Sequence, residues 1–118
     1  MALPLPSLRK NKNIKKVVIK KGVTAIADFA FKGCKKLKEI ILPSTLKKIG
    51  AYAFEECPIK NITIPKSVKS IEPGAFAGSS IKSITIPKTV KKLGEGVFGD
   101  CKKLESITMP GNIGVIKY

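Results

Sequence analysis

Residues 37–57 of this chain read LKEIILPSTLKKIGAYAFEEC, and the same line returns with changes along most of the 118-residue sequence. The units begin at Ile14, Leu37, Ile59, Ile81 and Leu104, at steps of 23, 22, 22 and 23 residues. Seventeen places after each of the first four starts comes a phenylalanine: Phe31, Phe54, Phe76 and Phe98. Because a unit this short cannot bury its own apolar side chains, the units must stack on one another, and the repeat predicts a solenoid.

Each unit has three recognisable parts. Apolar and polar side chains that alternate, as in residues 84–86 (ITI), predict a short strand. The proline that follows ends this strand, because proline cannot donate a hydrogen bond to a β-ladder. An apolar pair spaced like Val68 and Ile71 is expected to turn the chain back. The Ala-Phe-x-x-Cys segment spaces its apolar residues like one helical turn, with a glycine such as Gly33 near its end. We therefore expect stacked parallel strands, helical or irregular turns opposite them, and one buried column of phenylalanines.

The line from 37 to 57 resembles the BspA-like, or Treponema pallidum-type, leucine-rich repeat. The matching positions are Leu37, Ile40, Leu42, Pro43, Leu46, Ile49, Gly50, Ala53, Phe54 and Cys57. The likeness covers residues 14–118, with Lys20 in place of the proline and Ser79 in place of the cysteine. It implies a right-handed leucine-rich-repeat solenoid with strands on its concave side and turns on its convex side. It also implies a non-catalytic module at the surface of host-associated bacteria or parasitic protists, binding host or neighbouring-cell proteins.

The repeat divides the chain into an N-terminal cap or tail over residues 1–13 and a solenoid over residues 14–118. The fifth unit keeps its apolar pair, Ile113 and Ile116, but reaches Tyr118 before another Ala-Phe turn. Three alternatives stay open here: these residues close the stack, the sequence is a piece of a longer array, or the end pairs with a second copy.

Composition argues against catalysis. The chain has no histidine, which is the commonest general base and metal ligand. Its only adjacent carboxylates, Glu55 and Glu56, are expected to face solvent, whereas paired-carboxylate catalysis needs two groups opposed across a cleft. We therefore expect no enzyme activity, catalytic residue, cofactor or metal. No apolar run is long enough to cross a bilayer, and no signal peptide is recognisable, so an extracellular or cell-surface location rests on the resemblance alone.

Three cysteines, Cys34, Cys57 and Cys101, occupy the same place in their units. The first two fall in adjacent coils, but their side chains would point in parallel, which fits disulfide geometry poorly. Cys101 has Ser79 at that place in the unit before it, and the odd count argues against a disulfide framework. We expect buried free thiols that pack as small apolar groups.

The concave strand face is the main candidate for partner binding. Its expected outward residues are Lys16, Val18, Glu39, Ile41, Asn61, Thr63, Ser83, Thr85, Ser106 and Thr108. A rigid scaffold that presents such a strip is how solenoids bind partners, although threonine also simply suits exposed strand positions. We therefore expect a protein partner and an adhesion-type function.

Lysine columns offer an alternative. The chain carries 23 Lys+Arg against 8 Asp+Glu, for a net charge of +15, and Arg9 is its only arginine. The repeat register stacks lysines into three columns: Lys15, Lys38, Lys60 and Lys82; Lys21, Lys66 and Lys88; and Lys47, Lys69 and Lys91. Such columns favour an acidic cell-wall polymer, a glycosaminoglycan or an anionic lipid surface, or are merely solvated. Nucleic acid is disfavoured, because the phenylalanines are committed to the core and one arginine leaves little for reading bases.

Overall fold

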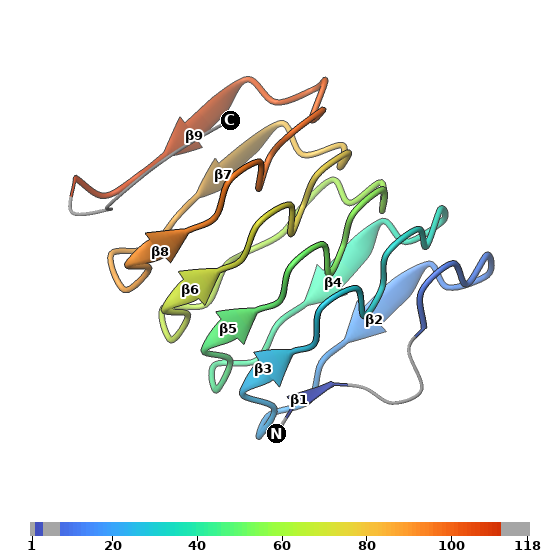
Figure 1. Cartoon of the computed structure of the whole chain (residues 1–118), viewed down its shortest axis with the longest axis horizontal. Coiled ribbons are helices and arrows are strands. Elements are labelled where there is room, and N and C mark those ends of the chain that lie inside the picture. Colours follow the sequence, from blue (N-terminus) through green and yellow to red (C-terminus); the bar gives the residue numbers. More distant parts are fainter. Residues whose placement is uncertain (1, 4–7, 112–118) are drawn as a thin grey trace.

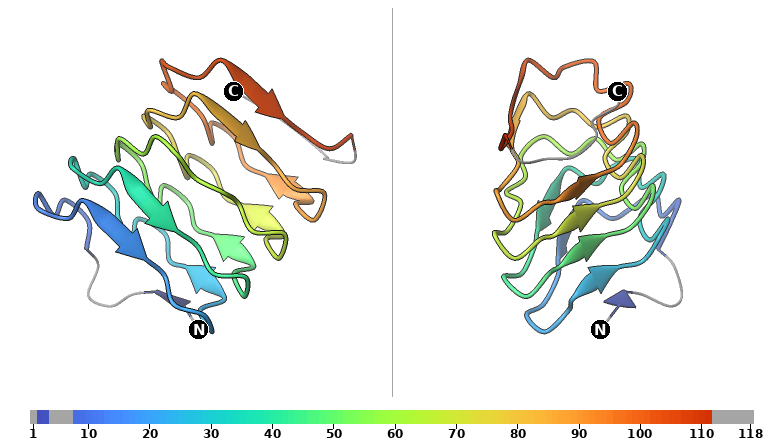
Figure 2. Two further views of the ribbon diagram at one scale, coloured as in Figure 1. Left: turned by 180° about the vertical axis from the view of Figure 1, so that it is seen from behind. Right: turned by 60° about the vertical axis from the view of Figure 1, so that its left-hand side comes forward.

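The computed structural model describes the backbone of residues 2–3 and all of residues 8–111. In this part of the chain each turn of a parallel β-solenoid runs around three sides, which we call the front sheet, the back sheet and the turn side (Figures 1 and 2). The front sheet lies on the far side of the molecule in Figure 1 and faces the viewer in the left view of Figure 2. Coil 1 spans residues 14–36, coil 2 residues 37–58, coil 3 residues 59–80 and coil 4 residues 81–103, and coil 5 begins at residue 104.

The front sheet is built from the strands that the sequence predicted, with one exception. Its members are β2 (Lys16–Val18), β4 (Glu39–Ile41), β7 (Ser83–Thr85) and β9 (Ser106–Thr108). β2 pairs with β4 and β7 pairs with β9, in parallel. The strand expected in coil 3 does not form, and only a single bridge, between Glu39 and Asn61, joins coil 3 to this sheet.

The interruption follows the repeat lengths. Full front pairing occurs where the starts of successive units are 23 residues apart and is lost at both 22-residue steps. One residue, Pro58, separates Cys57 from Ile59, whereas two residues separate Cys34 from Leu37. The chain therefore has one residue less with which to enter the front sheet in coil 3.

The back sheet was missed by sequence reasoning. The apolar pairs expected to turn the chain back instead supply strands β3 (Ala25–Ile26), β5 (Lys48–Ile49), β6 (Ser70–Ile71) and β8 (Lys92–Leu93). With β1 (Ala2–Leu3) they form one parallel sheet in the order β1-β3-β5-β6-β8. A two-residue strand carries too little alternation to be read from sequence, so the chain has two sheets where one was predicted.

The turn side contains no helix among the described residues, so of the two expected alternatives it is the irregular turn that forms. Its backbone pairs from coil to coil: the Phe31 N–H donates to the Ala53 carbonyl oxygen at 2.8 Å, and the Phe54 N–H donates to that of Ala75 at 2.9 Å. The residue before the cysteine position is left-handed in every complete coil: Gly33 (φ 75), Glu56 (φ 60), Gly78 (φ 74) and Asp100 (φ 54). A left-handed residue at this point prevents the turn from continuing as a right-handed helix.

The buried phenylalanine column is confirmed. Successive rings from Phe31 to Phe98 are stacked, with centroids 5.2, 5.5 and 6.2 Å apart. All four rings are buried, from 0% to 6% exposed, together with apolar residues of each coil such as Leu37, Ile40, Leu46 and Ile49 in coil 2. The three cysteines are also buried and free, as predicted, and the Cys57 thiol donates to the Phe31 carbonyl oxygen at 3.0 Å.

Residues 8–11 follow the course of a further turn. The Leu8 N–H donates to the Ala30 carbonyl oxygen at 3.0 Å, and the Cys34 thiol donates to the Leu8 carbonyl oxygen at 3.2 Å, as Cys57 does to Phe31. Leu8 thus takes the place that phenylalanine has in later coils. The rest of the expected N-terminal cap, at residues 1 and 4–7, and the end of the fifth unit, at Ile113, Ile116 and Tyr118, lie outside the described residues.

Candidate functional site

The front face gathers the residues that the sequence proposed for partner binding. All ten are exposed: Lys16, Val18, Glu39, Ile41, Asn61, Thr63, Ser83, Thr85, Ser106 and Thr108. Strand register places the members of each pair side by side on one face: Lys16 and Glu39, Val18 and Ile41, Ser83 and Ser106, and Thr85 and Thr108. In coil 3, which has no front strand, a single bridge places Asn61 beside Glu39.

The two ends of this face differ in chemistry. Val18 lies beside Ile41 at the N-terminal end, and they are 57% and 46% exposed, the highest values among the large exposed hydrophobic residues in the described chain. At the other end Thr85 lies beside Thr108 and offers hydroxyl groups. Between coils 1 and 2, Lys16 approaches Glu39 at 3.9 Å, but both side chains are more than half exposed and the pair contributes little.

Two hollows open on the front face, one on each side of coil 3. The first, about 800 Å³, lies between coils 2 and 3 and is lined by residues 38–42 and 60–63. The second, about 970 Å³, extends from coil 3 to coil 5 along residues 62–64 and 83–89. Both hollows border coil 3, where front pairing is interrupted. The interruption of the sheet therefore makes this face uneven.

The lysines of the three predicted columns are all exposed. Lys15, Lys38, Lys60 and Lys82 are exposed, and so are Lys21, Lys66, Lys88, Lys47, Lys69 and Lys91. The four ion pairs found in the described chain engage other lysines: Lys16, Lys32, Lys35 and Lys92. These four pairs therefore do not neutralise the positive field of the columns, although Lys88 makes a contact of its own.

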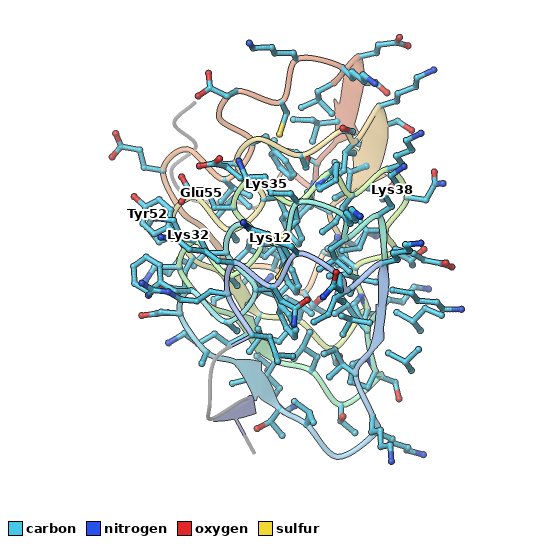
Figure 3. All side chains as sticks on the ribbon, turned by 90° about the vertical axis from the view of Figure 1, so that its right-hand side faces the viewer. Lys12, Lys32, Lys35, Lys38, Tyr52 and Glu55 are labelled. Carbon is cyan, nitrogen blue, oxygen red and sulfur yellow. The ribbon has the colours of Figure 1, made fainter. Side chains whose placement is uncertain are left out.

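An aromatic pair on the turn side was missed. Phe29 and Tyr52 are 36% and 37% exposed, and their rings stack at 5.6 Å with Lys32 5.5 Å from the Phe29 centroid. Figure 3 shows Tyr52, Lys32 and Glu55 together at one edge of the molecule, with Lys38 at the opposite edge. The signal was present in the sequence, since aromatic residues precede Ala-Phe at the same place in two successive units.

The thiols and carboxylates do not form a reactive centre. Burial raises the pKa of the Cys57 thiol to about 12 and also raises that of Cys34, so both stay protonated at neutral pH. Glu55 and Glu56 pair with Lys32 and Lys35 at 3.2 and 3.1 Å instead of facing each other across a cleft. Residues 8–111 contain no group of three side chains suited to hold a metal ion. Nor does the described chain contain a helix with the length and apolarity of a membrane span.

Stacked parallel strands, a phenylalanine column and a repeating leucine or isoleucine start define a leucine-rich-repeat β-solenoid. Residues 7–118 match the BspA type leucine-rich repeat region in six copies, and the chain belongs to this family. The match begins earlier than the resemblance read from the sequence and includes the further turn at residues 8–11.

Solved structures of other leucine-rich repeat proteins resemble this fold. A leucine-rich repeat protein from Bacteroides ovatus is 31% identical over 98% of this chain, with a TM-score of 0.90, and this chain covers 31% of it. The Treponema pallidum leucine-rich repeat protein is 35% identical over 78% of this chain, with a TM-score of 0.76 and 44% of its length covered. A leucine rich cell surface protein from Faecalibacterium prausnitzii is 25% identical over 86%, with a TM-score of 0.66 and 34% covered.

This chain therefore spans less than half the length of these three proteins. None of the curated proteins matches the sequence.

Proposed function

We propose that this domain is a non-catalytic protein-binding module of the adhesion type, which engages its partner through the front face. The observation that carries the proposal is the exposed strip from Lys16 to Thr108, in which β2 pairs with β4 and β7 pairs with β9, with a hollow on either side of coil 3. A solenoid scaffold holds such a strip rigid, so binding costs little ordering entropy. Membership of a repeat family used for protein interaction supports the same function. The Faecalibacterium prausnitzii relative is a cell surface protein, which supports an extracellular or surface location for this chain.

The test begins with a display library of fragments of bacterial and mammalian surface proteins, selected on the immobilised domain. Each selected binder is then measured against the triple variant Ile41→Glu, Thr63→Glu and Thr85→Glu. We expect at least about a tenfold loss of affinity, because desolvating unpaired carboxylates at an interface is costly.

The matched control adds three carboxylates elsewhere, with Ala51→Glu, Ser70→Glu and Ala77→Glu on the turn side and back sheet. These positions are partly exposed, and we expect affinity to stay within about twofold of wild type because they lie off the interface. Circular dichroism establishes that both variants are folded. The front face would be rejected as the binding site if the binders kept their affinity for the front-face variant, or if they lost the same affinity for both variants.

A second candidate, capture of an acidic polymer or anionic lipid surface, rests on the exposed lysine columns and the net charge of +15. Heparin and anionic vesicles serve as probes. Affinity dominated by the columns should fall steeply between 20 and 200 mM salt, roughly as the Debye length shortens, and a flat salt response rejects this candidate.

A further inference from the structure

The step between coils 3 and 4 is closed at the back and open at the front. At the back, Ser70 pairs with Lys92. At the front, no backbone hydrogen bond joins residues 60–64 to residues 82–86 within the described chain. Ring separations in the phenylalanine column follow the same trend: 5.2 Å where front pairing is complete, 5.5 Å where one bridge remains and 6.2 Å where none does. The two coils therefore diverge toward the front.

The hydroxyl group of Thr89, at the step between coils 3 and 4, lacks a hydrogen bond that its equivalents make in the coils before it. The Thr45 hydroxyl donates to the Val23 carbonyl oxygen of the coil before it at 2.8 Å, and the Ser67 hydroxyl donates to that of Leu46 at 2.5 Å. Thr89 occupies the same place in coil 4, and its hydroxyl oxygen is buried without a hydrogen-bond partner among the described residues. Thr89 also lines the 970 Å³ hollow, so the unpaired hydroxyl lies at the step where the front hydrogen bonds are missing.

Backbone groups line both edges of the open step. On either side of β7, backbone groups are hydrogen-bonded to coil 5: the Lys82 carbonyl oxygen accepts from the Ser106 N–H at 3.3 Å, and the Ile86 N–H donates to the Thr108 carbonyl oxygen at 2.8 Å. The intervening residues, Ser83 and Thr85, turn theirs toward coil 3, where no hydrogen bond is made in the described chain. Facing them, residues 62–64 make no backbone hydrogen bond within that same part of the protein. Unpaired N–H and C=O groups in a row are what an edge strand offers to another chain.

Charge at this step is positive at both ends. A smaller hollow of about 370 Å³ adjoins one end and is lined by Lys60, Asn61, Ser80, Lys82, Ser83 and Lys103, with no carboxylate. Lys66 and Lys88 line the larger hollow at the other end. Glu39, which bridges Asn61 from coil 2, and Glu105, which follows Lys82 in its column, are the acidic residues next to the step along the register, and neither lines these two hollows.

We propose that the open step between coils 3 and 4 binds an extended, acidic segment of a partner protein by β-strand addition. A peptide can satisfy the unpaired donors and the unpaired acceptors together, whereas a polyanion without amide groups can satisfy only the donors. Acidic side chains on the added strand meet the lysines at either end. The inference rests on the proposed front-face function and names the chemistry of its partner.

The experiment uses a capped octapeptide of alternating glutamate and valine, titrated into the ¹⁵N-labelled chain. We expect saturable amide shifts centred on residues 60–66 and 82–89. An analogue with alternate backbone nitrogens methylated should bind at least about tenfold more weakly, because it loses two or more hydrogen bonds. A lysine–valine octapeptide should not bind. Equal binding of the methylated and unmethylated peptides, or shifts centred elsewhere, overturns the proposal in favour of plain charge attraction or another site.

Two matched sets of lysine substitutions test which lysines attract the acidic peptide. Removing three charges at the step, with Lys60→Gln, Lys82→Gln and Lys103→Gln, should weaken binding of the acidic peptide at least about fivefold, because each lost cation removes an attraction to the carboxylates of the peptide. The control variant, Lys12→Gln, Lys36→Gln and Lys48→Gln, removes three exposed charges away from the step and should change affinity less than twofold. Equal losses in the two variants reject the site.

The two proposals fail separately. Binders from the library that are lost on the Ile41, Thr63 and Thr85 variant, together with an octapeptide that produces no shifts, would leave the front-face function standing and overturn strand addition. Library binders that ignore the front-face variant would remove the front-face function itself.

Discussion

At the scale of single residues, the turn side shows how one side chain sets the identity of its neighbour. Tyr52 is left-handed (φ 54), as are Gly74 (φ 66) and Gly96 (φ 68) at the same place in the next two coils. A Cβ at Gly74 would lie 2.3 Å from the Tyr52 ring, whereas a Cβ at Gly96 would meet nothing within 4 Å. A left-handed backbone favours glycine at both positions, although Tyr52 adopts this conformation as well, and at position 74 the ring above adds a steric restriction that position 96 lacks.

This difference predicts unequal costs for the same substitution. Gly96→Ala should lower the free energy of unfolding by about 1–2 kcal/mol, the cost of a left-handed alanine. Gly74→Ala should cost roughly 1 kcal/mol more, because the Tyr52 ring must leave its stack on Phe29. Urea unfolding of both variants gives the comparison, and Tyr52→Ala should remove the excess at position 74. Equal costs at the two positions would show that the ring moves aside freely.

The buried thiol of Cys57 makes stability depend on alkaline pH. Its pKa, about 12 when folded against 9.0 for an ordinary thiol, means that the unfolded chain loses this proton first as pH rises. Its contribution is therefore complete below pH 9 and declines between pH 9 and 12, by about 1.4 kcal/mol at pH 10. The Cys57→Ser variant, which copies the residue found at Ser79, should lack this part of the decline. Parallel pH profiles of unfolding free energy for the two proteins would contradict the assignment.

At the scale of elements, the repeat predicted those features whose positions follow from the spacing of residues along the sequence. Phe31 and Phe54 could be placed in one column because a period of 22 or 23 residues must bring them together when coils stack. Front strands β2 and β4 and the exposed strip were predictable for the same reason. The back strands were not, because each is two residues long and its partner lies a whole coil away. The gap at coil 3 was also missed, since a one-residue difference in a connector has no periodic signature.

Amide hydrogen exchange tests whether the front sheet is interrupted in solution. The amides of Ile62 and Ile64 make no backbone hydrogen bond in the described chain, whereas that of Ile19 donates to the Ile41 carbonyl oxygen at 2.9 Å. We expect the coil 3 amides to exchange at least about a hundredfold faster than that of Ile19, although they lie nearer the middle of the solenoid. Protection equal to that of Ile19 would mean that the ladder is continuous and that no open step exists.

At the scale of the whole molecule, charge is distributed unevenly around the coil. Six of the eight acidic residues lie on the turn segments: Asp28, Glu55, Glu56, Glu72, Glu95 and Asp100. The column from Lys15 to Lys82 has no acidic member until Glu105. Attraction for an acidic partner is therefore directed to the front edge, and the same asymmetry makes the folded state repel itself there.

That repulsion predicts a substitution that stabilises the protein while removing a charge. Lys60 stands between Lys38 and Lys82, and two ammonium groups about 5 Å apart repel by about 0.8 kcal/mol in water. Lys60→Gln should raise the free energy of unfolding by up to about 1 kcal/mol at 10 mM salt, and by much less at 500 mM, where screening is nearly complete. Lys35→Gln is the control, because Lys35 pairs with Glu56 at 3.1 Å and its loss should not stabilise the chain. Urea unfolding at both salt concentrations decides the matter: equal stabilisation by the two variants would make total charge, and not the column, the source of the repulsion.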